Sequence, residues 1–121
     1  MKRIYLILFS LTILLGCKHK TNFNELPTVS YSKDIQPIII SNCTQSGCHG
    51  SKNQEEFELL SYNDLIKNCE VTAGSPENSK LFEVITTYNK ENVMPRKPYN
   101  TLTEKQIQLI YVWIGQGAKN N

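Results

Sequence analysis

The stretch that decides the fold is Cys43-Thr44-Gln45-Ser46-Gly47-Cys48-His49-Gly50, where two thiols and an imidazole lie close together. The signature for c-type haem attachment has two residues between its cysteines and a histidine directly after the second; here four residues intervene. Two thiols can bond to the two vinyl groups of a haem, and a histidine beside the second thioether can reach the iron as proximal ligand. The stretch therefore predicts thioethers at Cys43 and Cys48 and an iron ligand at His49.

The wider spacing requires the chain to loop out between the two cysteines. Two intervening residues separate the cysteines by about one helical turn, and four intervening residues exceed that turn. Ser46-Gly47 supplies a permissive backbone for such a loop, and Gly50 lets the chain leave the haem edge without a side-chain clash. The spacing is compatible with attachment through both cysteines but does not by itself establish it.

The first seventeen residues have the pattern of an export signal. A basic start at Lys2-Arg3 precedes the apolar run from Ile4 to Leu15, which is shorter than the roughly 20 apolar residues that cross a bilayer. The closing Leu14-Leu15-Gly16-Cys17 resembles the lipobox of bacterial lipoproteins. This predicts a lipid anchor on Cys17 and a location in the cell envelope, on the periplasmic or outer face of a membrane, with an ordinary secretory signal as the alternative.

The chain that follows the signal is formally neutral. Loss of Lys2 and Arg3 lowers the count of basic residues from 13 to 11, which equals the 11 acidic residues. Nucleic-acid binding, which needs a basic patch, is not expected. Residues 18–29 are polar and predict a tether. Residues 30–121 predict one small domain, of a size that often relies on a disulfide, a metal or a cofactor for stability.

Two helices are expected in the first half of this domain. Tyr31, Ile35 and Ile38 recur at helical spacing within Ser30 to Asn42. Ser32 is a candidate cap for this helix, and Pro37 indicates either its first turn or a kink. A short second helix is expected to begin at Ser61 or Asn63.

Two more helices are expected in the second half. Ser75-Pro76 predicts a capped helix that runs to about Tyr88. Thr103 and Gln106 match a capping box, and Gly115 or Gly117 would end the helix that follows. This last helix is expected to pack on the first one.

The irregular stretch between the last two helices contains Val93-Met94-Pro95-Arg96. Met94 is the only methionine besides Met1, so it offers the only thioether left after the signal is removed. Histidine and methionine are the axial pair of electron-transfer cytochromes, and the thioether raises the reduction potential. Met94 is therefore predicted as the second iron ligand, with the filling of a core gap as the alternative.

Four separate motifs carry a family resemblance. In chain order they are the helix Tyr-Ser-x-Asp-Ile-x-Pro-Ile before the Cys…Cys-His-Gly site, the Gly-Ser-Pro-Glu-Asn-Ser-Lys-Leu turn, the Val-Met-Pro loop and the closing Leu-Thr-x-x-x-Ile-x-x-Ile-x-x-Trp-Ile-x-x-Gly-Ala helix. Together they resemble small class I c-type cytochromes, and most closely the lipoprotein and planctomycete-type cytochrome domains of bacteria. The resemblance covers roughly residues 30 to 118.

The resemblance implies an all-α fold of about four helices wrapped around one covalently attached haem c. It implies thioethers at Cys43 and Cys48, His49 as proximal ligand and Met94 as distal ligand. The expected function is that of a monomeric electron carrier whose iron cycles between Fe(II) and Fe(III), with no substrate chemistry and no catalytic residue. Its expected partners are redox proteins, met through transient contacts at an exposed haem edge.

Three alternatives stay open at this point, and two of them use Cys69, to which the resemblance gives no role. Cys43, Cys48, His49 and Cys69 could form a zinc site that stabilises an exported structural or binding module. A disulfide between Cys43 and Cys69 could leave haem attached through Cys48 alone. Displacement of Met94 could open the iron for a peroxidase or a sensor, although the only other histidine, His19, lies in the tether.

Overall fold

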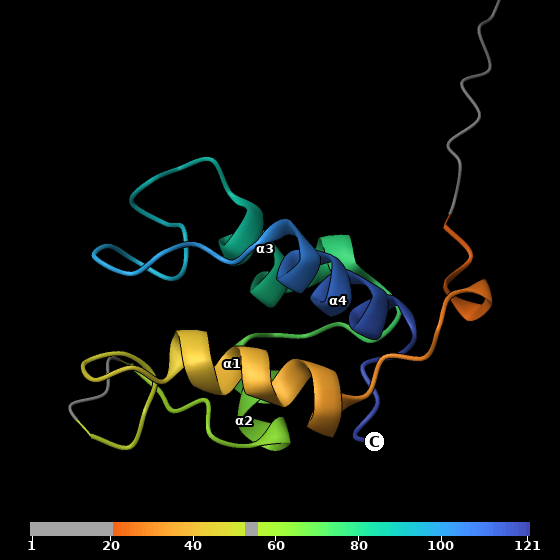
Figure 1. The fold of residues 1–121 in the computed structure, drawn as a ribbon, viewed down its shortest axis with the longest axis horizontal. Helices are drawn as coiled ribbons and strands as arrows, with labels where there is room; N and C mark the ends of the chain where they lie inside the picture. The colour runs from red at the N-terminus through yellow and green to blue at the C-terminus, as the bar shows by residue number, and fades with distance from the viewer. Residues whose placement is uncertain (1–20, 53–55) are drawn as a thin grey trace, which may run out of the picture.

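The structure, a computed structural model, describes residues 21–52 and 56–121, and its regular elements are all helical (Figure 1). The α-helices are α1 (Gln36–Cys43), α2 (Tyr62–Asn68), α3 (Lys80–Thr86) and α4 (Glu104–Gly115). Shorter pieces are a π-helical segment at Tyr31–Ile35 and 3-10 turns at Phe23–Glu25 and Pro76–Asn78. No strand occurs in the described residues, so the predicted all-α class is confirmed, while its wrapping around a haem stays a prediction.

The first helix begins earlier than the sequence suggested. The Ser30 hydroxyl accepts a hydrogen bond from the amide of Lys33, and the Ser30 amide donates to the Asp34 carboxylate at 2.8 Å. The prediction of Ser32 as the cap is wrong, because its hydroxyl donates instead to the backbone oxygen of Asn121 at 2.9 Å. Pro37 lies in the first turn of α1, which is one of the two outcomes expected from the sequence.

Local sequence signals predicted the start of the second helix correctly but not the start of the third. Ser61 caps α2 through a capping box with Asp64, which confirms one of the two predicted starts. The third helix is divided, because the fully buried Ser79 bonds back to the preceding turn. Its hydroxyl accepts from the amide of Thr72 at 2.9 Å and donates to the carbonyl of Ser75 at 3.0 Å. Helix α3 therefore begins after Ser79 and is shorter than predicted.

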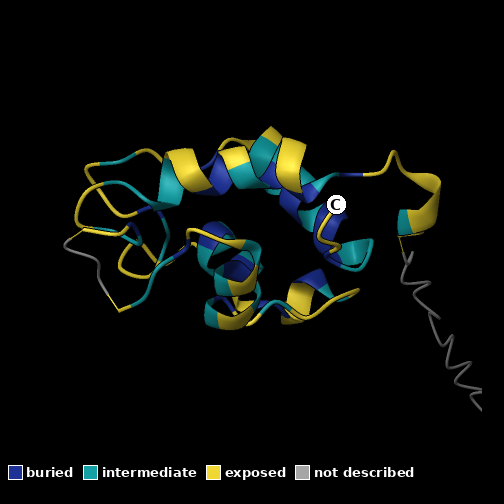
Figure 2. Ribbon diagram, turned by 90° about the horizontal axis from the view of Figure 1, so that it is seen from below, coloured by how far each residue is buried: buried dark blue, intermediate teal, exposed yellow. Residues whose placement is uncertain are grey.

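Helix α4 forms the centre of the core. Its capping box between Thr103 and Gln106 and its end at Gly115 are as predicted. Trp113 is fully buried, and its ring lies 5.8 Å from that of Tyr31. The predicted packing of the last helix on the first is therefore confirmed, through the π-helical segment, and Figure 2 shows the buried positions lining the inner sides of the helices.

The described residues contain no membrane-spanning element. Within residues 21–52 and 56–121, no helix has the length and apolar character needed to cross a bilayer. The predicted signal at residues 1–17, including Cys17, lies outside the described residues, as do residues 18–20 of the predicted tether.

Candidate functional site

Two loops extend from the same end of the molecule and carry the residues singled out by the sequence (Figure 1). The motif loop, residues 44–52, follows the C-terminal end of α1, which terminates at Cys43. The methionine loop, residues 87–101, follows the C-terminal end of α3. Since α1 and α3 both end on this side, the fold brings Cys43, Cys48, His49 and Met94 to one end.

The motif loop folds back on itself so that its two ends meet. The amide of His49 donates to the carbonyl of Cys43 at 3.0 Å, and the amide of Cys48 donates to the carbonyl of Gln45 at 2.9 Å. Gly47 adopts a left-handed backbone with φ +81°, which glycine accepts without strain. The predicted loop-out at Ser46-Gly47 is confirmed, and the hydrogen bonds bring the backbone of His49 next to that of Cys43.

Gly50 has a role in this loop that differs from the predicted one. A Cβ atom at this position would lie 2.6 Å from the carbonyl oxygen of Thr44, which is too close for any side chain. The sequence indicated that Gly50 avoids a clash with a haem edge. In the structure, its missing side chain allows two backbone segments of the motif loop to approach each other.

The imidazole of His49 is oriented by Phe57. Its Nδ1 lies 3.0 Å from the carbonyl oxygen of Phe57, and because a carbonyl only accepts, Nδ1 carries the hydrogen and donates. The two rings also stack, with centroids 4.5 Å apart and planes at 15°. This leaves the lone pair of Nε2 free, which is the arrangement typical of a metal-ligating histidine.

Phe57 was missed by the sequence analysis. Its carbonyl is a backbone group that every residue carries, and its ring stands alone after a charged segment. The only available signal was an aromatic residue eight positions after a candidate ligand, and that spacing does not belong to a recognised motif.

The methionine loop holds Met94 by its backbone. The Met94 amide donates to the carbonyl of Val84 in α3 at 2.8 Å, and the following Pro95 is buried. Met94 itself is half-buried and belongs neither to the described hydrophobic core nor to the partly buried side chains packed against it. This position weighs against the alternative in which Met94 fills a core gap.

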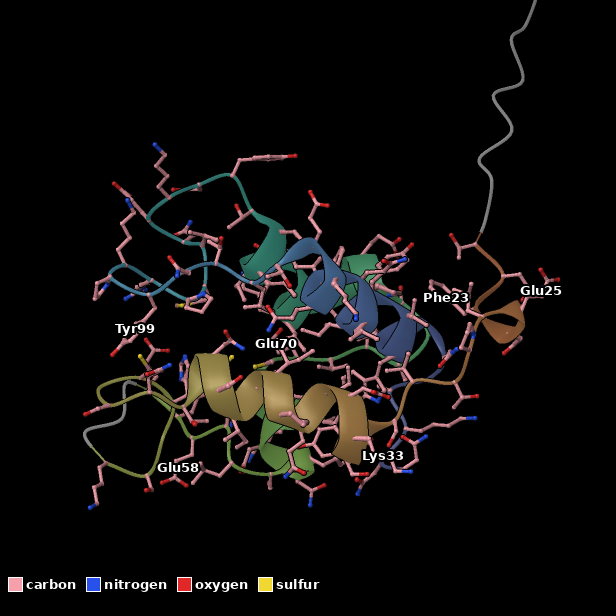
Figure 3. All side chains as sticks on the ribbon, in the orientation of Figure 1. Phe23, Glu25, Lys33, Glu58, Glu70 and Tyr99 are labelled. Carbon is pink, nitrogen blue, oxygen red and sulfur yellow. The ribbon has the colours of Figure 1, made fainter. Side chains whose placement is uncertain are left out.

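A cleft of about 270 Å³ lies between the end of α1 with its motif loop and the methionine loop. It is lined by Asn42, Gln45, Pro95, Pro98, Tyr99 and Asn100. Tyr99 lies on the side of the methionine loop that faces the motif loop (Figure 3). The candidate ligands Cys43, Cys48, His49 and Met94 are not among the residues that line this cleft.

The tertiary structure adds Cys69, the C-cap residue of α2, to this region. Burial raises the pKa of Cys43 to about 12, with a further contribution from the Cys48 thiol. Burial also raises the pKa of Cys69 to about 12, and the Cys43 thiol adds to the increase. Cys69 belongs to the buried core against which Cys43 packs, and the three cysteines of the described residues are free thiols.

The arrangement does not fit the zinc alternative. All four proposed ligands, Cys43, Cys48, His49 and Cys69, are described, yet no three Cys, His, Asp or Glu side chains within 21–52 and 56–121 converge as a metal site. The Nδ1 atom of His49 is already engaged by Phe57. The donors do fit a haem, because two thiols adjoin an oriented imidazole with a free Nε2, and a thioether lies on the other loop.

Comparison with known proteins finds a similarity in part of the chain. Residues 46–98 match the family model described as Planctomycete cytochrome C, a range that is less than half of the 121 residues. The matched range includes Cys48, His49 and Met94, while Cys43 and α4 lie outside it. No curated protein and no solved structure matches the chain.

Proposed function

We propose that this chain, of which residues 46–98 match the family model described as Planctomycete cytochrome C, is a monohaem electron carrier tethered to a membrane. A c-type cytochrome uses haem c, whose iron would alternate between Fe(II) and Fe(III) and so carry one electron. The observation that best supports the proposal is the imidazole of His49, held through Nδ1 by the Phe57 carbonyl and left with a free Nε2.

The chain's own residues would divide the work of holding the cofactor. Cys43 and Cys48 would supply the thioethers that make attachment permanent. The carbonyl of Phe57 orients the His49 ring and makes Nε2 a stronger donor. Met94 would be the second protein ligand, and the hydrogen bond from its amide to the carbonyl of Val84 positions it.

Electron transfer, and not catalysis, follows from this ligand pair. If both His49 and Met94 served as ligands, they would leave the iron without an open site for a substrate. The cleft opens at the end formed by two loops, where a redox protein could approach through a transient contact. We propose that the chain acts as a monomer, held in the cell envelope by a lipid on Cys17.

The test is to produce the full chain in a host that exports proteins and has a cytochrome c maturation system. The purified protein is measured by mass and by its pyridine haemochrome spectrum. A mass raised by one haem that survives denaturation, with a spectrum of two saturated vinyl groups, supports attachment through both cysteines. Absence of haem, when a control cytochrome matures normally, overturns the proposal.

Two matched variants separate the roles of the thiols. Cys43→Ala is expected to leave haem bound through Cys48 and to show one unsaturated vinyl group in the haemochrome spectrum. Cys69→Ala is expected to retain the spectrum of the unchanged protein. A spectrum with one unsaturated vinyl group in the unchanged protein would select the version in which Cys43 pairs with Cys69.

A further inference from the structure

The last residues of the predicted tether are bound to α4. We call residues 22–29 the strap. The side-chain amide of Gln116, at the end of α4, hydrogen-bonds to four backbone groups of this segment. Its nitrogen donates to the carbonyls of Phe23 (3.1 Å), Leu26 (3.3 Å) and Pro27 (3.0 Å), and its oxygen accepts from the amide of Val29 (2.9 Å).

A close apolar contact accompanies these hydrogen bonds. The ring of Phe23 lies against the backbone of Gly115, where an added Cβ atom would clash with the ring. The same ring packs on Tyr111, with centroids 5.2 Å apart. At the other end of the strap, Val29 is buried in the core. The strap is therefore part of the folded domain and not a free linker.

The strap lies at the end of the molecule opposite the cleft. Figure 1 shows the strap beside the C-terminal end of α4, while the motif and methionine loops extend from the far side. Figure 2, seen from another direction, shows the same separation. Phe23 and Glu25 mark the strap end in Figure 3, and Tyr99 marks the cleft end.

The length of chain between the proposed lipid anchor and the strap limits how the domain can turn. Five peptide steps separate Cys17 from Asn22, and a fully extended chain covers at most about 3.6 Å per residue, or about 18 Å. Without the strap, the 13 steps to Ser30 would allow about 47 Å. A compact domain of this size is about 30 Å across.

We infer that the strap is an orienting contact that keeps the cleft from facing the membrane. Pointing the cleft at the bilayer would lift the strap end by about the domain's diameter, roughly 30 Å, which exceeds the roughly 18 Å of chain available. The redox partner is therefore a protein that approaches from the aqueous side, and not a carrier dissolved in the bilayer. This inference rests on the proposed lipid anchor at Cys17.

The test measures the distance of the cleft end from the membrane in the full lipidated chain. A fluorescent amino acid replaces Lys90, an exposed residue of the methionine loop, and the protein is bound to phosphatidylcholine vesicles that carry a headgroup acceptor dye. Transfer is calculated from the donor fluorescence on vesicles with and without the acceptor dye, so quenching of the donor by a bound haem is corrected, and haem attachment is measured separately by the haemochrome spectrum.

Two variants release the domain by different routes. Gln116→Leu removes the four hydrogen bonds to the strap, with Gln108→Leu, on the exposed side of α4, as the matched control. An insertion of twelve flexible Gly/Ser residues after residue 20 restores reach without changing the domain, since about 3.6 Å per residue adds roughly 43 Å of chain. The insertion keeps the test decisive if Gln116→Leu fails to fold.

We expect low energy transfer in the unchanged chain and in Gln108→Leu, and higher transfer in Gln116→Leu and in the insertion variant. Equal transfer in the unchanged chain and in the insertion variant would overturn the inference, because the short chain would then impose no orientation. A chain that does not float with the vesicles would overturn both the lipid anchor and the orientation. Loss of haem with normal flotation and low transfer would overturn the proposed function alone.

Discussion

The strap end and the cleft end of this molecule are held together by different interactions. At the strap end, Ile110, Trp113 and Ile114 are fully buried and pack on the first helical segment. At the cleft end, the described motif loop and the methionine loop bury one residue each, Gly50 and Pro95. The strap end is stabilised by apolar burial. The cleft end is shaped by backbone hydrogen bonds in the two loops that carry the candidate ligands.

This difference indicates where a cofactor would matter for stability. A domain of this size buries a smaller share of its surface than larger domains and often depends on a cofactor. The core around α4 has its own apolar partners, whereas the two loops do not. A haem between the loops would supply apolar surface where the chain supplies little, so its loss should loosen the cleft end and spare the strap end.

The largest expected effect is loss of haem at the cleft end with the helical fold at the strap end retained. His49→Ala is expected to abolish stable haem incorporation, because no other described histidine can replace it as a ligand. The helical content, measured by circular dichroism, should be largely retained because the α4 core is unchanged. Haem content is measured by the pyridine haemochrome spectrum, with His19→Ala as the control. A normally loaded His49→Ala protein would refute the assignment.

A substitution in the core is expected to destabilise both ends. Trp113→Ala removes a fully buried ring and should lower the free energy of unfolding by about 3–5 kcal/mol. Urea denaturation measures the change, and Tyr88→Ala serves as control because Tyr88 is fully exposed. A loss no larger than that of Tyr88→Ala would show that the packing around α4 contributes little.

A change on the methionine loop is expected to alter the redox property without unfolding the strap end. Met94→Ala should lower the reduction potential, because thioether ligation raises it, and should allow added ligands to bind the iron. A redox titration and binding of imidazole measure the two effects, with the neighbouring half-buried Val93→Ala as control. An unchanged potential would mean that another group lies opposite His49.

The smallest effect is expected at the start of α4. Thr103→Ala removes the side chain that accepts from the Gln106 amide and should cost about 1 kcal/mol of stability. Haem content should stay the same, since the cap lies outside the cleft. The control is Thr101→Ala, an exposed position. A loss of haem in Thr103→Ala would show that the two ends are more tightly coupled than their packing indicates.

The sequence predicted those features that depend on neighbouring residues. The capping box of Thr103 with Gln106, the end of α4 at Gly115 and the cap at Ser61 each rest on contacts within one turn, and all three are present. The loop-out at Gly47 follows from the same local chemistry. The resemblance to planctomycete-type cytochrome domains, carried by short motifs in order, is confirmed by the family match.

Local patterns failed where distant residues compete for the same group. Ser32 is a reasonable cap by spacing, but Asn121 from the other end of the chain takes its hydroxyl. Ser75 is a reasonable start for a helix, but the buried hydroxyl of Ser79 bonds to Thr72 and Ser75 and delays α3. Neither outcome has a signal within the segment itself.

The sequence by itself therefore determined the helical class, the start of α2 and both ends of α4, and it predicted donor atoms at Cys43, Cys48, His49 and Met94. Only the tertiary structure decided that the Phe57 carbonyl orients the imidazole, that Cys43 packs against the core containing Cys69 and that Gln116 binds the strap. The physical reason is the sequence separation between the residues that make each contact. Caps and turns are set by atoms a few residues apart, whereas these contacts form only after α1, α3 and α4 have packed and brought remote segments together.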